Sequence, residues 1–98
     1  MNKQVYSDQE EGELYDSLVQ LVSREEAAAF FKDLCTPQER AALTERWQVC
    51  RLLARGDLSY RAIHERIGSS LATITRVARF LKDEPHGGYR AMLKKIVP

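Results

Sequence analysis

The chain has 98 residues and a formal net charge of +1, and 44% of its residues are hydrophobic. This length predicts one small domain whose core area is limiting. The chain contains no run of about 18 apolar residues and no signal-peptide pattern, which argues against a membrane-spanning segment, so we expect a soluble, cytoplasmic protein.

The charge is divided unevenly along the chain. Residues 1–45 contain 4 Lys and Arg against 10 Asp and Glu, a net charge of −6, whereas residues 46–98 contain 11 against 4, a net charge of +7. A basic second half suggests a polyanionic partner. The alternative is a solvated surface that follows an acidic N-terminal segment.

The two cysteines, Cys35 and Cys50, form no C-x-x-C motif and have no histidine nearby at metal-binding spacing. We expect two free thiols in largely apolar surroundings. The sequence indicates no metal site and no cofactor.

The first third of the chain predicts two helices. Ser7 or Asp8 can cap the first helix. Its apolar residues follow helical spacing and are Leu14, Tyr15, Leu18, Val19, Leu21 and Val22. Ser23 and Glu26 have capping-box spacing and predict a second helix through Leu34.

A longer third helix is predicted from Pro37 to Arg55. Thr36 and Glu39 again have capping-box spacing, proline suits the first helical position, and Gly56 is a stop signal. Its apolar residues form two offset stripes: Leu43, Trp47, Cys50 and Ala54 in one, Val49, Leu52 and Leu53 in the other. A helix that is apolar on two sides is usually packed between two neighbours, and in so small a chain we expect a second subunit to be one of them.

Residues 58–83 have the pattern of a helix-turn-helix. Ser59 is a candidate N-cap for a short helix over residues 60–67, and Gly68 suits the left-handed turn that follows. Ser69 or Ser70 caps the second helix. The apolar stripe of that helix comprises Ile74, Val77, Ala78 and Leu81.

The opposite face of the second helix carries small and basic residues: Ala72, Thr73, Thr75, Arg76 and Arg79. Such a face suits a helix in the major groove of double-stranded DNA, where its first residues reach base edges and arginines neutralise phosphates. An ordinary helical hairpin with a solvated basic face is the alternative.

The chain closes with a joint and a last helix. Lys82 to Pro85 ends the second helix, because the residue before proline is disfavoured in helical conformation. Gly87 and Gly88 form a flexible joint, and residues 88–97 a short closing helix.

No enzyme motif is present: the sequence lacks a Gly-rich phosphate loop, an H-E-x-x-H pattern and a nucleophile elbow. His64 and His86 have no plausible acid or base partner nearby in the sequence. We therefore do not expect an enzyme.

Three stretches, Leu34–Leu43, Leu52–Ser59 and Leu71–Arg76, resemble the Trp repressor superfamily. The last, Leu-Ala-Thr-Ile-Thr-Arg after a helix-turn-helix turn, is fairly specific. The resemblance covers roughly residues 10–97, and the closing Gly-Gly-Tyr-Arg is more similar to short YerC/YecD-type homologues.

This resemblance implies an all-α fold of six helices and an intertwined homodimer. The chain would be a single DNA-binding domain over 1–98, with dimerisation helices in 1–55, the helix-turn-helix in 58–83 and a closing helix in 88–97. The implied DNA contacts are Tyr60, Arg61, His64, Ser70, Leu71, Ala72, Thr73 and Thr75, and Arg76 and Arg79 join them as basic residues.

The resemblance also implies a corepressor site. Arg46 and Arg76 occupy the positions of the two arginines that flank the indole in the family, and Thr36 matches a pocket threonine. Val77 and Phe80, however, replace a glycine and a serine. Their bulk predicts a filled pocket that does not take tryptophan, and leaves another small effector, or none, open.

The sequence therefore favours a homodimeric, sequence-specific DNA-binding transcriptional regulator, expected to be a repressor. One alternative is an effector-gated repressor that binds a small ligand between Arg46 and Arg76. Another is a helical protein–protein interaction module, against which the exposed Thr/Arg face and the basic second half argue.

Overall fold

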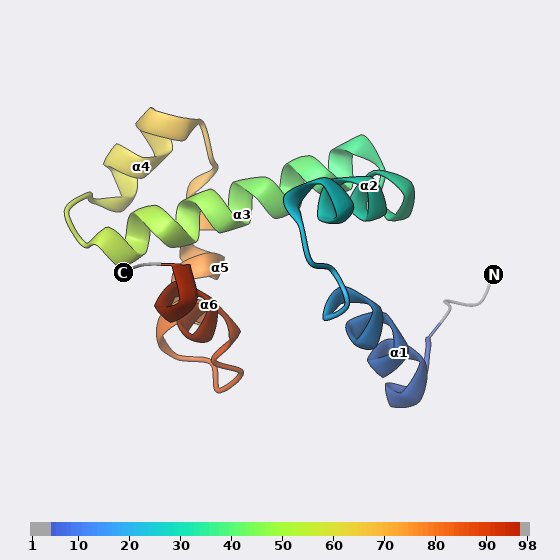
Figure 1. Cartoon of the computed structure of the whole chain (residues 1–98). Coiled ribbons are helices and arrows are strands. Elements are labelled where there is room, and N and C mark those ends of the chain that lie inside the picture. Colours follow the sequence, from blue (N-terminus) through green and yellow to red (C-terminus); the bar gives the residue numbers. More distant parts are fainter. Residues whose placement is uncertain (1–4, 97–98) are drawn as a thin grey trace. The chain divides into compact units, whose positions relative to one another are not determined.

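A computed structural model of the chain describes residues 5–96, which form six α-helices and no strand. This confirms the predicted all-α fold. The chain divides into two compact units, one up to Arg40 and one from Ala41 onwards, with the boundary near the start of the third helix (Figure 1). Within the described residues, no helix is long and apolar enough to cross a membrane.

Helix α1 (Asp8–Leu18) begins at a complete capping box. Ser7 Oγ accepts from the Glu10 N–H at 3.1 Å, and the Glu10 carboxylate accepts from the Ser7 N–H at 2.9 Å. These bonds lower the pKa of Glu10, because they favour its charged form.

The end of α1 corrects the sequence interpretation, in which helical spacing continued to Val22. The helix stops at Leu18, and Gln20 and Leu21 donate back to Ser17 and Leu18 in a turn. The N–H of Val22 donates instead to Glu26 Oε1 at 3.0 Å, in the next helix. Glu26, in the first turn of that helix, therefore accepts the bond from the Val22 N–H, which is then not available to extend α1.

Helix α2 (Arg24–Leu34) is capped by Ser23, whose hydroxyl accepts from the Glu26 N–H at 3.0 Å, as predicted. Neither α1 nor α2 contains a buried residue. Large apolar side chains are consequently exposed, including Tyr15 at 53% and Val22 at 85%.

Helix α3 (Pro37–Arg55) matches its predicted bounds. Thr36 and Glu39 form the capping box, with bonds of 3.1 and 2.8 Å, and Gly56 ends the helix at a φ of 77°. Only its C-terminal half reaches a core: Val49 and Cys50 are fully buried.

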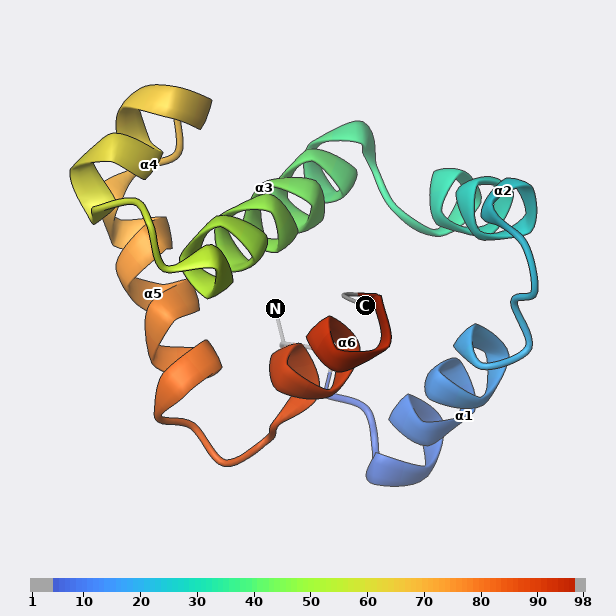
Figure 2. The ribbon, with the colours of Figure 1, turned by 60° about the vertical axis from the view of Figure 1, so that its left-hand side comes forward.

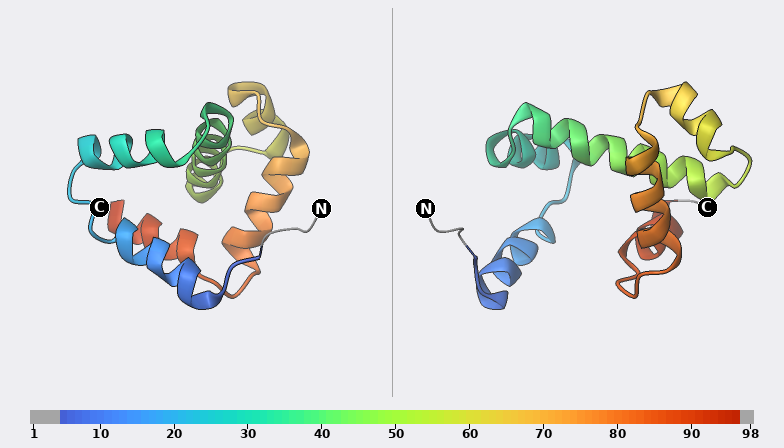
Figure 3. Two further views of the ribbon diagram at one scale, coloured as in Figure 1. Left: turned by 90° about the vertical axis from the view of Figure 1, so that its right-hand side faces the viewer. Right: turned by 180° about the vertical axis from the view of Figure 1, so that it is seen from behind.

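The core of the second unit lies between α3, α4 (Tyr60–Ile67) and α5 (Leu71–Lys82). It comprises Val49, Cys50, Ile63, Ile74, Val77 and Leu81. The predicted apolar stripe of α5 is thus its buried side. In Figures 1 and 3, α4 and α6 lie on opposite sides of the C-terminal half of α3.

Helix α6 (Gly88–Ile96) packs on this core through Tyr89 and Leu93. Arg90 Nη1 donates to the Leu81 carbonyl at 2.6 Å, which satisfies a carbonyl group at the C-terminal end of α5. Gly88 is the first residue of α6 rather than part of a joint, and residue 97, the predicted last residue of the closing helix, lies outside the described residues.

Candidate nucleic-acid interface

Helices α4 and α5 form the predicted helix-turn-helix, and Figure 2 shows the short turn that joins them. Ser59 caps α4 by accepting from the Ala62 N–H at 3.1 Å. Gly68 ends α4 in the left-handed region at a φ of 74°. Of the two candidate caps for α5, Ser70 is the one used, accepting from the Thr73 N–H at 3.1 Å.

Ser69 has a different role, which the sequence analysis did not find. Its side chain is buried, and its hydroxyl donates to Glu45 Oε2 on α3 at 2.5 Å. Its carbonyl group lies 2.6 Å from His64 Nδ1 on α4. Nothing in the local pattern of residues signals a partner 24 positions away.

The predicted base-reading residues lie on the open side of α5. Leu71 is 49% exposed, and Ala72 and Thr75 are exposed as well. Thr73 is half-buried, and its Oγ1 accepts from the Ser70 hydroxyl at 3.0 Å, so it belongs in part to the cap. The first turns of α5 therefore expose the apolar side chains of Leu71 and Ala72 and the side chain of Thr75 to solvent.

The basic residues predicted to meet phosphate are also exposed. Arg76 and Arg79 follow on α5, and Arg61 and His64 on α4. Tyr60, at the start of α4, has the Lys82 ammonium 5.9 Å from its ring centroid. The Glu84 carboxylate comes within 3.6 Å of Arg79 Nε and offsets part of its charge.

The His64 ring has a defined tautomer. A carbonyl oxygen only accepts hydrogen bonds, so Nδ1 must carry the proton and donate to the Ser69 carbonyl. In the neutral ring Nε2 is then the acceptor.

Residues 9–97 match the sequence profile described as Trp repressor protein. The chain belongs to the Trp repressor family. Members of this family are DNA-binding regulators and not enzymes, and this classification applies to the chain as well.

Individual relatives of the chain support the assignment to this family. The uncharacterized protein YerC of Bacillus subtilis (strain 168) is 42% identical over 69 residues, which is 70% of this chain and 65% of YerC. A Trp operon repressor homolog of Vibrio cholerae is 33% identical over 86 residues, 88% of this chain and 84% of that protein. The aligned part thus spans just under two thirds of YerC and most of the Vibrio protein.

Solved structures of this family share the fold. A TrpR like protein from Eubacterium eligens has a TM-score of 0.81 and 34% sequence identity to this chain. The match covers 90% of this chain and 89% of that protein's chain. A Staphylococcus aureus structure, described as a candidate Trp repressor, has a TM-score of 0.83 at the same identity, with 92% and 88% covered.

The residues predicted to form a corepressor site differ in exposure. Val77 is 1% exposed and belongs to the core, whereas Arg46 is exposed. The guanidinium of Arg76 lies over the Phe80 ring, 4.3 Å from its centroid. Thr36 lies in the first unit, where it caps α3.

Phe80 is at the centre of an aromatic and basic cluster at the α5–α6 corner. Its ring stacks on His86 with centroids 5.8 Å apart and planes 11° apart, and Arg79 lies 4.9 Å from its centroid. An open pocket of about 330 Å³ remains beside it. The pocket is lined by Arg76, Val77, Phe80, His86, Gly88 and Tyr89.

Tyr89 of α6 also approaches this region. Its ring lies 6.2 Å from that of Trp47, and burial and the nearby Cys50 raise the pKa of its phenol, while the charges of Arg46 and Arg76 act in the opposite direction.

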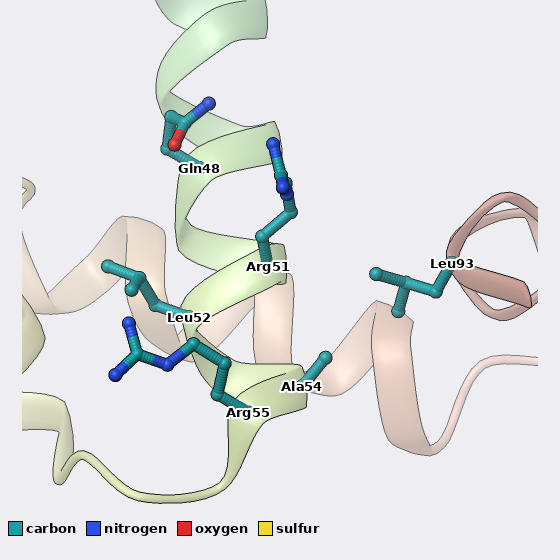
Figure 4. Close-up of a pocket in the computed structure, with 6 residues that line it drawn as sticks. All are labelled: Gln48, Arg51, Leu52, Ala54, Arg55 and Leu93. Carbon is teal, nitrogen blue, oxygen red and sulfur yellow. The ribbon is translucent and has the colours of Figure 1, made fainter. Parts of the chain in front are cut away.

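A second pocket of about 370 Å³ lies between α3 and α6. Figure 4 shows Leu93 of α6 pointing toward the side of α3 that carries Ala54 and Arg51. Leu52 and Arg55 extend to the other side of α3 in this view. The second unit therefore also carries an uncovered groove with an apolar floor.

Proposed function

We propose that this protein is a sequence-specific transcriptional repressor that binds double-stranded DNA as a homodimer in the cytoplasm, without requiring tryptophan. The observation that carries the proposal is the exposed N-terminal half of α5, held in a helix-turn-helix by a core on its other side. A helix presented in this way can enter a major groove.

The proposed contacts divide by chemistry. Leu71 and Ala72 give apolar contact to base edges or thymine methyl groups, and the Thr75 hydroxyl gives a hydrogen bond. Ser70 and Thr73 lie at the same end of α5. The remaining contacts approach the phosphates and fix the register of the protein on the duplex. They are Tyr60, Arg61, His64, Arg76 and Arg79.

The homodimer is proposed from the uncovered apolar side chains of α1 and α2, with residues 1–55 as the dimerisation helices. A chain this short has a limited core of its own, and a second copy would bury these side chains. Two copies would also supply the two reading helices that a palindromic site needs.

Tryptophan independence is supported by Phe80, whose ring centroid lies 4.3 Å from the Arg76 guanidinium. In the family arrangement the indole lies between two arginines, so Phe80 would compete with an indole for contact with Arg76. The open pocket beside Phe80 favours a second candidate function, an effector-gated repressor whose small ligand differs from tryptophan and is bound near Arg46 and Arg76.

The test is the salt dependence of duplex binding from about 50 to 200 mM salt, because each phosphate contact adds about −0.9 to the slope of log K against log salt. We expect a steep slope, reduced by about 1 in Arg76→Ala and in Arg79→Ala. Lys94→Ala, an exposed change on α6 outside the proposed contacts and dimerisation helices, is the matched control. Absence of DNA binding at low salt would instead support a helical protein–protein interaction module.

A further inference from the structure

The turn between α4 and α5 buries a polar side chain. Ser69 is 1% exposed, while its neighbours Gly68 and Ser70 are exposed. A hydroxyl taken out of water destabilises a fold unless it is hydrogen-bonded. The partners of Ser69 therefore show what this position does.

The side chain of Ser69 is bound by α3. Its hydroxyl donates to Glu45 Oε2 at 2.5 Å, and Glu45 is itself half-buried. Bonds from a hydroxyl to a carboxylate are short and about twice as strong as neutral ones. This bond ties the turn to a helix that is remote in the sequence.

The backbone of Ser69 is bound by α4. His64 Nδ1 donates to the Ser69 carbonyl at 2.6 Å. One turn residue is thus held by two helices, through its side chain and through its carbonyl group.

These hydrogen bonds constrain the orientation of the turn, which the apolar contacts of the core do less well. Ile63 and Ile74 pack α4 and α5 together, but apolar contact sets distance more than rotation. Hydrogen bonds depend on angle. Ser69 immediately precedes Ser70, the N-cap of α5, so holding Ser69 holds the first turn of that helix.

We propose that Glu45, Ser69 and His64 form a polar clamp that positions the first turn of α5 for reading DNA bases. The inference rests on the proposed function. Glu45, Ser69 and His64 are positioning residues, because each holds the turn through these bonds. All three groups belong to the chain, so the clamp acts without a small-molecule effector.

The experiment compares binding of Ser69→Ala to a duplex selected by the wild-type protein and to a scrambled duplex. We expect about tenfold weaker binding to the selected site, as for loss of one hydrogen bond to a charged group, and less than about twofold change on the scrambled duplex. Lys94→Gln, an exposed change on α6 outside the proposed DNA contacts and dimerisation helices, is the control and should keep the wild-type ratio of the two affinities.

A second variant covers the case in which Ser69→Ala does not fold. Glu45→Gln keeps the shape and an acceptor oxygen but replaces a bond to a charged group by a neutral one, so the ratio of the two affinities should fall about threefold from the wild-type value. The double variant should lose no more than Ser69→Ala alone, because Ser69→Ala already removes the bond that Glu45→Gln weakens. Equal loss on both duplexes, or wild-type selectivity in both single variants, would overturn the clamp.

The His64 side of the clamp has a spectroscopic test that needs no DNA. Long-range ¹H–¹⁵N spectra of the wild-type protein should show the Nδ1–H tautomer of His64, and a predominant Nε2–H form would overturn this half of the clamp. If the wild-type protein selects no DNA site while His64 shows the Nδ1–H tautomer, the proposed function fails and the clamp geometry stands without its role in readout.

Discussion

Some side chains of α5 are buried and stabilise the fold, and others are exposed and are proposed to contact DNA. Ile74 and Val77 are buried, while Thr75 between them is exposed. A substitution at Thr75 can therefore change recognition without disturbing the core.

Thr75→Ala should reduce discrimination between bases by about 1–3 kcal/mol, the range for a good base contact, with stability unchanged. The measurement is binding to the selected duplex and to single-base variants of it. Thr44→Ala, an exposed threonine on α3, is the control. The same loss on every duplex would show that Thr75 contacts phosphate instead.

A second residue, Cys50, predicts a dependence of stability on pH. Burial raises the pKa of its thiol from 9.0 to about 11. The unfolded chain loses this proton first, so the free energy of unfolding should fall as pH rises from 9 to 11, by at most about 2 kcal/mol. Tyr89, whose pKa burial also raises, acts in the same direction.

Denaturant unfolding of wild type and Cys50→Ala at pH 7, 9 and 10 measures this effect. The variant is expected to be less stable throughout, because it leaves a cavity, yet to lose less stability with rising pH. Parallel curves for the two proteins would argue against the shifted thiol.

The helices of this chain depend on the backbone conformations that individual residues allow, and two glycines can be used to test this dependence. Gly68 ends α4 with a φ of 74°, whereas Gly12 lies inside α1, and an added Cβ would meet no atom within 4 Å at either site. Gly68→Ala should lower the free energy of unfolding by about 1–2 kcal/mol, the cost of a left-handed residue.

Gly12→Ala should raise the free energy of unfolding by about 0.5–1 kcal/mol, since alanine favours helix over glycine. Thermal unfolding of both variants gives the comparison. Changes of the same sign would show that packing in the assembled protein, and not backbone conformation, decides one of the two sites.

The same local chemistry explains what the sequence could predict. The caps Ser59 and Thr36 and the stops Gly56 and Gly68 act within four residues, so the bounds of α3 and α4 followed directly from the residues present. The end of α1 was missed because an apolar spacing that fits a helix continues through a turn.

Long-range contacts were beyond sequence reasoning for a physical reason. The bond from Ser69 to Glu45 joins residues 24 positions apart, and the stack of Phe80 on His86 depends on how the chain bends after α5. No periodicity encodes either contact. Family resemblance named Arg76 and Phe80 as pocket residues but did not place one over the other.

For the whole molecule, the exposed apolar side chains of α1 and α2 predict the state of assembly. Sedimentation should give twice the 11.2 kDa mass of one chain. Leu34→Asp, at an exposed apolar position of α2, should shift the protein toward monomer, because a buried unpaired charge is costly. Lys32→Asp on the same helix is the control, and a monomeric wild type would contradict the proposed dimer.

The most direct test of the central claim is selection of binding sites by the purified protein from a random duplex library, in parallel with and without L-tryptophan. We predict that the same palindromic site is enriched in both arms, because Phe80 covers Arg76 and the turn of the helix-turn-helix is held by the chain itself. Enrichment only in the presence of tryptophan would contradict the account, since it would mean that Val77 and Phe80 leave room for the indole.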